Sequence, residues 1–491
     1  MAEASLRKFR PTASTPWDYA KAAHLLSRAG FGGPPDEIQR LVSLGFDAAV
    51  DELLNYERAP DLPGEVDFSE LRQAYVDAFA LRQGGADEPM RRTLQNRINR
   101  LQREKLQEVR EWWMARMVAT KRPLQEKMVL FWHGLLVSGF PDVRSPEFLY
   151  LQNHLFRRMG LGNFKQLILE ISKDPAMLTY LDNNSNRKGR PNENYARELM
   201  ELFTMGIGNY TEQDIKEAAR AFTGWMLRPT PGGRFEFYFN PGQHDDGTKT
   251  FLGKTGNFDG GDVINIIFEQ PATARWLPRK LFEYFVHLRP EESVLEELGG
   301  LFKRSNFDVR PLVQTLLQSE AFYSEKGLRT QVKGPTQLVV STARTLGIPP
   351  TMAPALVLAA DQMGQMLLVP PNVGGWPKGE SWITTSTILD RYNFGSLVTS
   401  GRMPGLPRRF LQSVRPVEVS GLVPASAGTA GEVTATLLRR LLPGAAIEQK
   451  RQFALWRALG ANRATDPVKA TPDRVRSALH LIMSMPEYQL T

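Results

Sequence analysis

The chain contains no cysteine among its 491 residues. This absence excludes disulfide bonds, thiolate metal sites and cysteine nucleophiles, and it is compatible with either redox compartment. Long apolar runs are also missing, because no stretch approaches the roughly 18 uncharged apolar residues that a membrane helix needs. The N-terminal residues likewise show no apolar core of a signal peptide. We therefore expect a soluble protein without a transmembrane segment, cytoplasmic by default.

Neither sign of charge dominates the sequence. Lysine and arginine number 61 against 53 aspartates and glutamates, a formal net charge of +8 that is spread along the chain. So small an excess does not favour a nucleic acid as the partner, and it fits an anionic ligand or surface better. Apolar residues make up 42% and charged residues 23%, which is typical of a folded globular protein.

Helical spacing of apolar residues runs through most of the chain. It predicts a mainly α fold, a large multi-helix, bundle-like domain. The exception lies at 229–261, where Phe235, Phe237 and Phe239 alternate with other side chains and KTFLG follows, which predicts a small β-hairpin insertion near 234–256. We divide the chain into an N-terminal arm at 1–15, a main helical domain at 16–400 and a C-terminal helical segment at 401–491 packed on it.

The stretch 189–206, GRPNENYARELMELFTMG, is the richest in functional side chains. Proline enforces an extended entry and the following asparagine can cap a helix. At about 100° per residue the apolar side chains fall on one arc, and the opposite arc carries Asn194, Arg197, Glu198 and Glu201. Two carboxylates one turn apart can hold a metal or share a proton. A solvated face with an ion pair between Arg197 and Glu201 explains the pattern equally simply.

Two histidines stand out elsewhere. His133 lies in a helix that is apolar nearly all round, so we expect a buried imidazole whose partner is a carbonyl, a carboxylate or a metal. His244 lies beside Asp245 and Lys249 in GQHDDGTK, a cluster that suits a metal or an anion. An Asp-Gly turn with a neighbouring histidine accounts for the second cluster as well.

A compact loop of prolines and aromatics, PPNVGGWPKGESW, follows in the second half of the chain. Such loops are usually packed structure, but their side chains can also bind ligands. Asn372, Trp376 and Trp382 could close one wall of a pocket.

A phosphate-binding loop is suggested by the GKT triplet at 253–255, but the spacing is wrong. Five residues separate Gly247 from Gly253, whereas the motif has four, and a helix does not follow directly. We therefore expect no nucleotide cofactor, and no haem.

Several longer motifs together resemble a known family. They are HLLSRAGFG, FWHGLLVSGF, DPAMLTYLDNNSNRKGRPNENYARELMELFTMGIGNYTE, HDDGTKTFLGKTGNFDG and PPNVGGWP. These motifs resemble the large bacterial family called domain of unknown function 1800, over residues 17–490. The resemblance implies a mainly helical protein without an established reaction. It also implies a possible partner, a sulfatase-like protein of the family domain of unknown function 1501, and it makes the cell envelope an alternative location because many members are exported.

The leading hypothesis is a metal-dependent enzyme, a hydrolase or an oxidoreductase, that uses iron, manganese or zinc. Its catalytic residues would be Glu198, Glu201 and His133. The metal would be held by these three residues together with His244 and Asp245, and the substrate by Arg190, Asn194, Arg197, Lys249, Asn372 and Trp376. The alternative is a non-catalytic scaffold or maturation partner of the sulfatase-like protein, in which the carboxylates belong to a buried network that fixes the fold.

Overall fold

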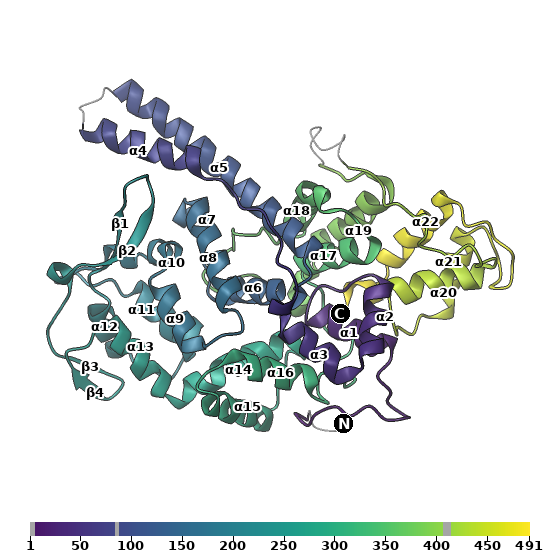
Figure 1. Ribbon diagram of the computed structural model, residues 1–491, viewed down its shortest axis with the longest axis horizontal. Coiled ribbons are helices and arrows are strands. Elements are labelled where there is room, and N and C mark those ends of the chain that lie inside the picture. The colour runs from purple at the N-terminus through teal and green to yellow at the C-terminus, as the bar shows by residue number, and fades with distance from the viewer. Residues whose placement is uncertain (1–4, 84–87, 406–413) are drawn as a thin grey trace.

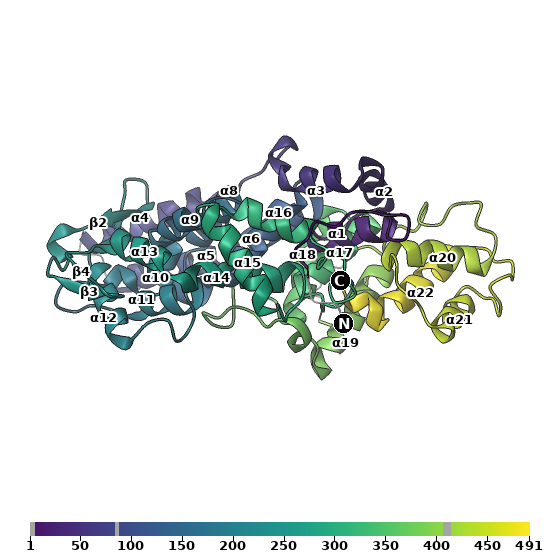
Figure 2. The ribbon, with the colours of Figure 1, turned by 90° about the horizontal axis from the view of Figure 1, so that it is seen from below.

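The computed structural model describes residues 5–83, 88–405 and 414–491. Within them the chain is mainly helical, with two antiparallel pairs of short strands, which confirms the predicted fold class. The parts of the predicted arm and C-terminal segment at 1–4 and 406–413 lie outside the described residues. The strands lie at one end of an elongated molecule (Figures 1 and 2), and the other end is formed by α20 (Ala430–Leu441), α21 (Gln449–Ala458) and α22 (Pro472–Met483).

Three short helices open the fold. They are α1 (Tyr19–Arg28), α2 (Pro35–Leu44) and α3 (Phe46–Leu54), followed by a 3₁₀ turn, η1 (Tyr56–Arg58). The Asp18 carboxylate caps α1 by accepting a hydrogen bond from the backbone N–H of Lys21 at 2.9 Å. Helix α2 begins at a proline, whose missing N–H costs nothing in the first turn.

A long helical hairpin projects from the body (Figure 1), formed by α4 (Ser69–Gln83) and α5 (Glu88–Ala119). The C-terminal half of α5 is buried and packs against α8 (Pro146–Met159), α17 (Pro335–Leu346) and α18 (Ala353–Gln362). This helix therefore joins segments that are far apart in the sequence.

Helix α6 (Pro123–Leu135) is the centre of the core, with nearly every residue buried as its apolar sequence predicts. Its only carboxylate, Glu126, is fully buried and accepts hydrogen bonds from Arg116 Nε at 2.8 Å, Arg157 Nε at 2.7 Å and Trp113 Nε1 at 3.2 Å. Burial acts to raise the pKa of Glu126, but the two guanidinium groups outweigh burial and lower it. The buried carboxylate of Glu126 is thus compensated by two opposite charges.

Short helices follow α6 in the first half of the chain. They are α7 (Phe140–Val143), α9 (Phe164–Ser172), α10 (Pro175–Tyr180), η2 (Asn183–Ser185), α11 (Asn194–Glu198) and α12 (Glu212–Ala221). The helix predicted at 189–206 starts as α11 and continues as a π-helical turn, η3 (Leu199–Thr204). The hydroxyl of Thr204 donates to the carbonyl oxygen of Leu199, five residues earlier.

The strands differ from the expected pairing. β2 (Phe235–Phe239) pairs with β1 (Trp225–Pro229), while β3 (Lys249–Phe251) pairs with β4 (Lys254–Gly256). The 229–261 insertion thus contains the second strand of one hairpin and all of another, because the first strand begins at Trp225, before the predicted insertion. A short turn, η4 (Pro241–Gln243), connects the two.

The second half of the chain returns to helices. These are α13 (Gly260–Glu269), α14 (Pro271–Phe285), α15 (Glu292–Arg304), α16 (Val309–Gln318), η5 (Pro350–Met352), η6 (Gly379–Trp382), α19 (Thr385–Ser400) and η8 (Pro486–Gln489). α20 packs on α17 and α22 packs on α19, so the C-terminal helices contact the preceding ones, while the division at residue 400 stays a prediction. Among the described residues no helix combines the length and the apolarity needed to cross a bilayer.

Candidate functional site

His133 is buried in α6, as its sequence context predicts, and its partner is the backbone. Its Nε2 atom accepts a hydrogen bond from the N–H of Leu368 at 3.2 Å. The ring packs between Trp113 and Trp376, with centroid distances of 5.3 Å and 5.1 Å. Burial lowers the pKa of His133 to about 3, so the imidazole is neutral at physiological pH. This environment anchors the loop that contains Leu368 and Trp376 to α6.

Glu198 and Glu201, the two carboxylates of the helix predicted at 189–206, are only partly buried. Glu201 accepts a hydrogen bond from the Tyr210 hydroxyl at 2.9 Å, and partial burial, followed by the charge of Glu201, raises the pKa of Glu198. Arg197 pairs with Glu212 at 2.8 Å and with Glu193 at 3.5 Å, and not with Glu201. Asn194 is the first residue of α11.

The hairpin cluster is held together by internal bonds. His244 Nδ1 lies 2.9 Å from the carbonyl oxygen of Thr223, and Asp245 accepts hydrogen bonds from Arg220 Nε at 2.8 Å and Nη2 at 3.2 Å. These bonds lower the pKa of Asp245 to about 2. Lys249 is fully buried and donates to the carbonyl oxygen of Asp245. The lysine predicted to bind substrate is therefore engaged in holding its own loop.

The predicted metal ligands do not form one set. Across residues 5–83, 88–405 and 414–491, no group of three or more histidine, aspartate or glutamate side chains is placed to hold a metal ion. Arg190, predicted to bind substrate, is exposed near Asn192 and Glu193. Metal binding stays a prediction, and the positions of the described residues give it no ligand set.

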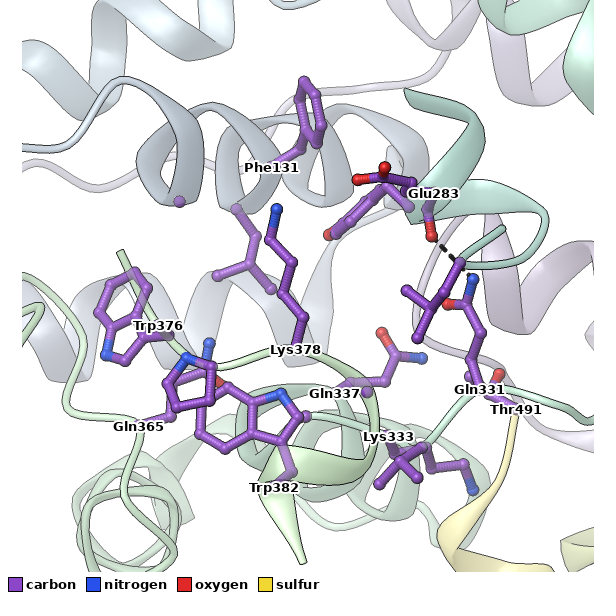
Figure 3. Close-up of a pocket in the computed structure, with 18 of the residues that line it drawn as sticks. Phe131, Glu283, Gln331, Lys333, Gln337, Gln365, Trp376, Lys378, Trp382 and Thr491 are labelled. Carbon is purple, nitrogen blue, oxygen red and sulfur yellow. Dashed lines mark hydrogen bonds between the residues drawn. The ribbon is translucent and has the colours of Figure 1, made fainter. Parts of the chain in front are cut away.

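A cavity of about 160 Å³ lies between α6, α14, α17 and the loop at 376–382. Trp376 and Trp382 form part of its wall, on the side of the predicted aromatic loop (Figure 3). Asn372 is exposed instead, and its side chain accepts a hydrogen bond from the N–H of Gly374 at 2.9 Å. A volume of this size is close to the roughly 150 Å³ of a cavity that holds benzene. The cavity therefore suits a small ligand.

Positive charge dominates the lining of this cavity. It contains one carboxylate side chain, that of Glu283, and five cationic ones, Arg28, Lys127, Lys280, Lys333 and Lys378. Within the described parts of the chain, none of the five forms a salt bridge with a carboxylate. A buried cation without a counter-ion is costly, so this arrangement favours an anion as the ligand.

The deepest cations are Arg28 on α1 and Lys127 on α6. Arg28 is 1% exposed, donates from Nη2 to the carbonyl oxygens of Val286 and Gly327, and leaves Nε and Nη1 buried without a partner. Burial lowers the pKa of Arg28 to about 9, which still leaves it charged at neutral pH. Lys127 donates to Gln337, and burial, followed by repulsion from Arg28, lowers its pKa.

Two further lysines approach from the C-terminal half. Lys333 donates to the carbonyl oxygen of Tyr488 at 2.9 Å, and burial lowers its pKa to about 7. Lys378 is exposed at the mouth, and its amine extends toward the centre of the cavity (Figure 3). Within the described residues, the side-chain amine of Lys378 has no hydrogen-bond or ion-pair partner. It is the cation most available to a ligand.

Sequence reasoning missed this cationic cavity because its charges come from five separated segments. The sequence indicated one part of the cavity, the aromatic loop with Trp376. It did not indicate Lys378, two residues later. Single cations on separate helices show no spacing pattern, and their meeting depends on how the helices pack.

Comparison with known proteins gives one result. A family model described as protein of unknown function (DUF1800) matches residues 24–490, nearly the whole chain. No curated protein and no solved structure matches. The match covers α6 and the residues of the cavity at 28, 127, 280–284, 331–337 and 376–382. The chain therefore belongs to the DUF1800 family of proteins of unknown function.

Proposed function

We propose that this protein binds a small organic anion in the cavity between α6, α14, α17 and the loop at 376–382. The observation that carries the proposal is the lining, with five cationic side chains against a single carboxylate side chain. The two unpaired nitrogens of the buried Arg28 give the proposal a specific donor group. A carboxylate, phosphate or sulfate group would supply the acceptors that Arg28 lacks.

The walls suggest the rest of the ligand. Trp376 and Trp382 offer flat apolar surface beside the charged floor, and Phe131 closes the opposite side (Figure 3). A pocket with an apolar wall and a few convergent polar groups is the usual form of a small-molecule site. The ligand thus combines one anionic group with a short apolar or planar part.

Isothermal titration calorimetry tests the proposal with a series of small anions, for example phenyl phosphate, benzoate and sulfate, beside neutral and cationic analogues. We expect binding of the anions alone, and Lys378→Met to weaken it about tenfold to hundredfold, since a charge-assisted hydrogen bond contributes about 1.5–3 kcal/mol. The matched control is Lys254→Met. It removes an exposed lysine of the distant hairpin, where Lys254 pairs with Glu269 at the end of α13. Equal affinity in both variants would refute the site.

Two earlier hypotheses remain as proposals. A metal-dependent reaction at Glu198, Glu201, His133, His244 and Asp245 is tested by elemental analysis of protein purified without chelators. A scaffold role beside a sulfatase-like partner is tested by co-purification. The cationic cavity is compatible with either, because binding an anion does not specify what is done to it.

A further inference from the structure

The loop that contains Lys378 is fixed by close contacts on both sides. Gly375 adopts a φ of +81°, and a Cβ atom there would lie 2.7 Å from the carbonyl oxygen of Gly134 in α6. Gly379 adopts a φ of +56°, and a Cβ atom would lie 2.6 Å from Leu288 Cδ1. Both positions require glycine. The lysine therefore extends from a backbone that is held against α6 and the end of α14.

Burial and charged neighbours both act on the amine of Lys378. Burial of its amine end and the like charge of Lys280 lower the pKa of Lys378, against an opposing effect of Glu283. A cation–π contact holds the neighbouring Lys280, whose Nζ atom lies 4.2 Å from the centroid of the Trp276 ring. An amine desolvated beside another cation is the arrangement that makes a lysine nucleophilic.

We infer that Lys378 condenses with the carbonyl group of a small anionic aldehyde or 2-oxo acid to form an imine. This inference rests on the proposed anion-binding function of the same cavity. Arg28 and Lys127 lie on the floor and would hold the anionic group of the substrate. Lys378 enters from the mouth, and Glu283 points into the same space (Figure 3).

The step is balanced without any further reactant. The lone pair of Lys378 Nζ forms a bond to the carbonyl carbon, and one of the two nitrogen protons passes to the carbonyl oxygen to give a carbinolamine. The Glu283 carboxylate then accepts the second proton of the nitrogen and delivers it to the hydroxyl group, which leaves as water. One amine and one carbonyl group thus yield one imine and one water, and nothing is oxidised or reduced.

Reductive trapping of the full-length protein tests this inference. The probe is glyoxylate with sodium cyanoborohydride, which would convert an imine into a stable carboxymethyl adduct, located by peptide mass spectrometry. We expect Lys378 to be modified at least tenfold faster than the control Lys254, and excess sulfate to slow the modification of Lys378 alone. Acetaldehyde, which lacks the anionic group, should show no preference for Lys378.

Calorimetry of the wild type separates this inference from the proposed function, because anion binding needs no imine. The variant Lys378→Arg cannot form an imine, so we expect no adduct at position 378 and unchanged modification of Lys254. Uniform modification of exposed lysines in a protein that still binds anions would overturn the imine and leave the anion site standing. Failure of the wild type to bind any anion would overturn both.

Discussion

Among single residues, two buried sets of charges differ in the partners that surround them. Glu126 and its partners Arg116 and Arg157 form a closed set, in which each charge has an opposite charge within 2.8 Å. Arg28 has carbonyl oxygens but no carboxylate, and two of its nitrogens have no partner. The first arrangement is typical of a structural network, whereas the second leaves donor groups that we propose an anion to occupy.

The closed set leads to a stability prediction. Glu126→Gln should lower the free energy of unfolding by about 3–5 kcal/mol, because it leaves the buried Arg157 without a counter-charge and Arg116 with the exposed Asp61 alone. Glu212→Gln is the matched control, since Glu212 pairs with Arg197 at the surface and exposed pairs contribute about 1 kcal/mol or less. Urea unfolding followed by circular dichroism measures both, and equal losses would contradict the structural role of Glu126.

Burial of single side chains followed from the sequence better than their partners did. The apolar surroundings of His133 predict a buried imidazole, and the structure buries it. Its partner, the N–H of Leu368, lies more than two hundred positions away, so local sequence offered no means of choosing among a carbonyl, a carboxylate and a metal. The same limit applies to Lys249, whose hydrogen bond to the carbonyl oxygen of Asp245 depends on the local loop conformation.

Among the elements, the helix at 189–206 shows which features the periodicity of apolar residues can predict. Tyr195, Leu199 and Phe203 are buried as the helical projection predicts. The π-helical turn at Leu199–Thr204 was not predictable, because the pattern of apolar residues fixes the buried face but not the number of residues per turn. Two residues after this turn, Gly206 packs against Trp276 on α14.

That contact gives a prediction for the end of the turn. A Cβ atom at Gly206 would lie 2.7 Å from Trp276 Cζ3, at a φ of +83°, whereas Gly208 has a similar φ of +88° and open space around it. Gly206→Ala should therefore destabilise the protein by about 2–4 kcal/mol and Gly208→Ala by about 1 kcal/mol, the cost of backbone strain alone. Thermal unfolding compares the two, and similar shifts would contradict the packing of η3 on α14.

The strands illustrate the opposite case, in which local pattern misplaced an element. The alternation of Phe235, Phe237 and Phe239 identified β2 correctly. Its partner β1 begins before the predicted insertion, because WML continues the helical spacing of the residues before it. Gly224, with a φ of +80°, separates the helix from the strand. Conformation at one glycine thus decided the topology of the hairpin.

At the scale of the whole molecule, the fold brings dispersed charges to one place. The net charge of +8 gave only a general expectation of an anionic partner. The structure concentrates five cations from α1, α6, α14 and two later segments around a cavity of about 160 Å³. The mainly helical class and the family were predictable from the sequence. The cavity was not, because it depends on the packing order of the helices, which no local pattern encodes.

The measurement that tests the central claim most directly is a crystal structure of the protein soaked with tungstate, a small dianion whose position is visible by anomalous scattering. The account predicts an anomalous peak inside the cavity, within hydrogen-bond distance of Lys378 and of the unpaired nitrogens of Arg28, and no peak there in Lys378→Met at the same concentration. Tungstate bound only at surface lysines such as Lys254, with the cavity occupied by water alone, would contradict it.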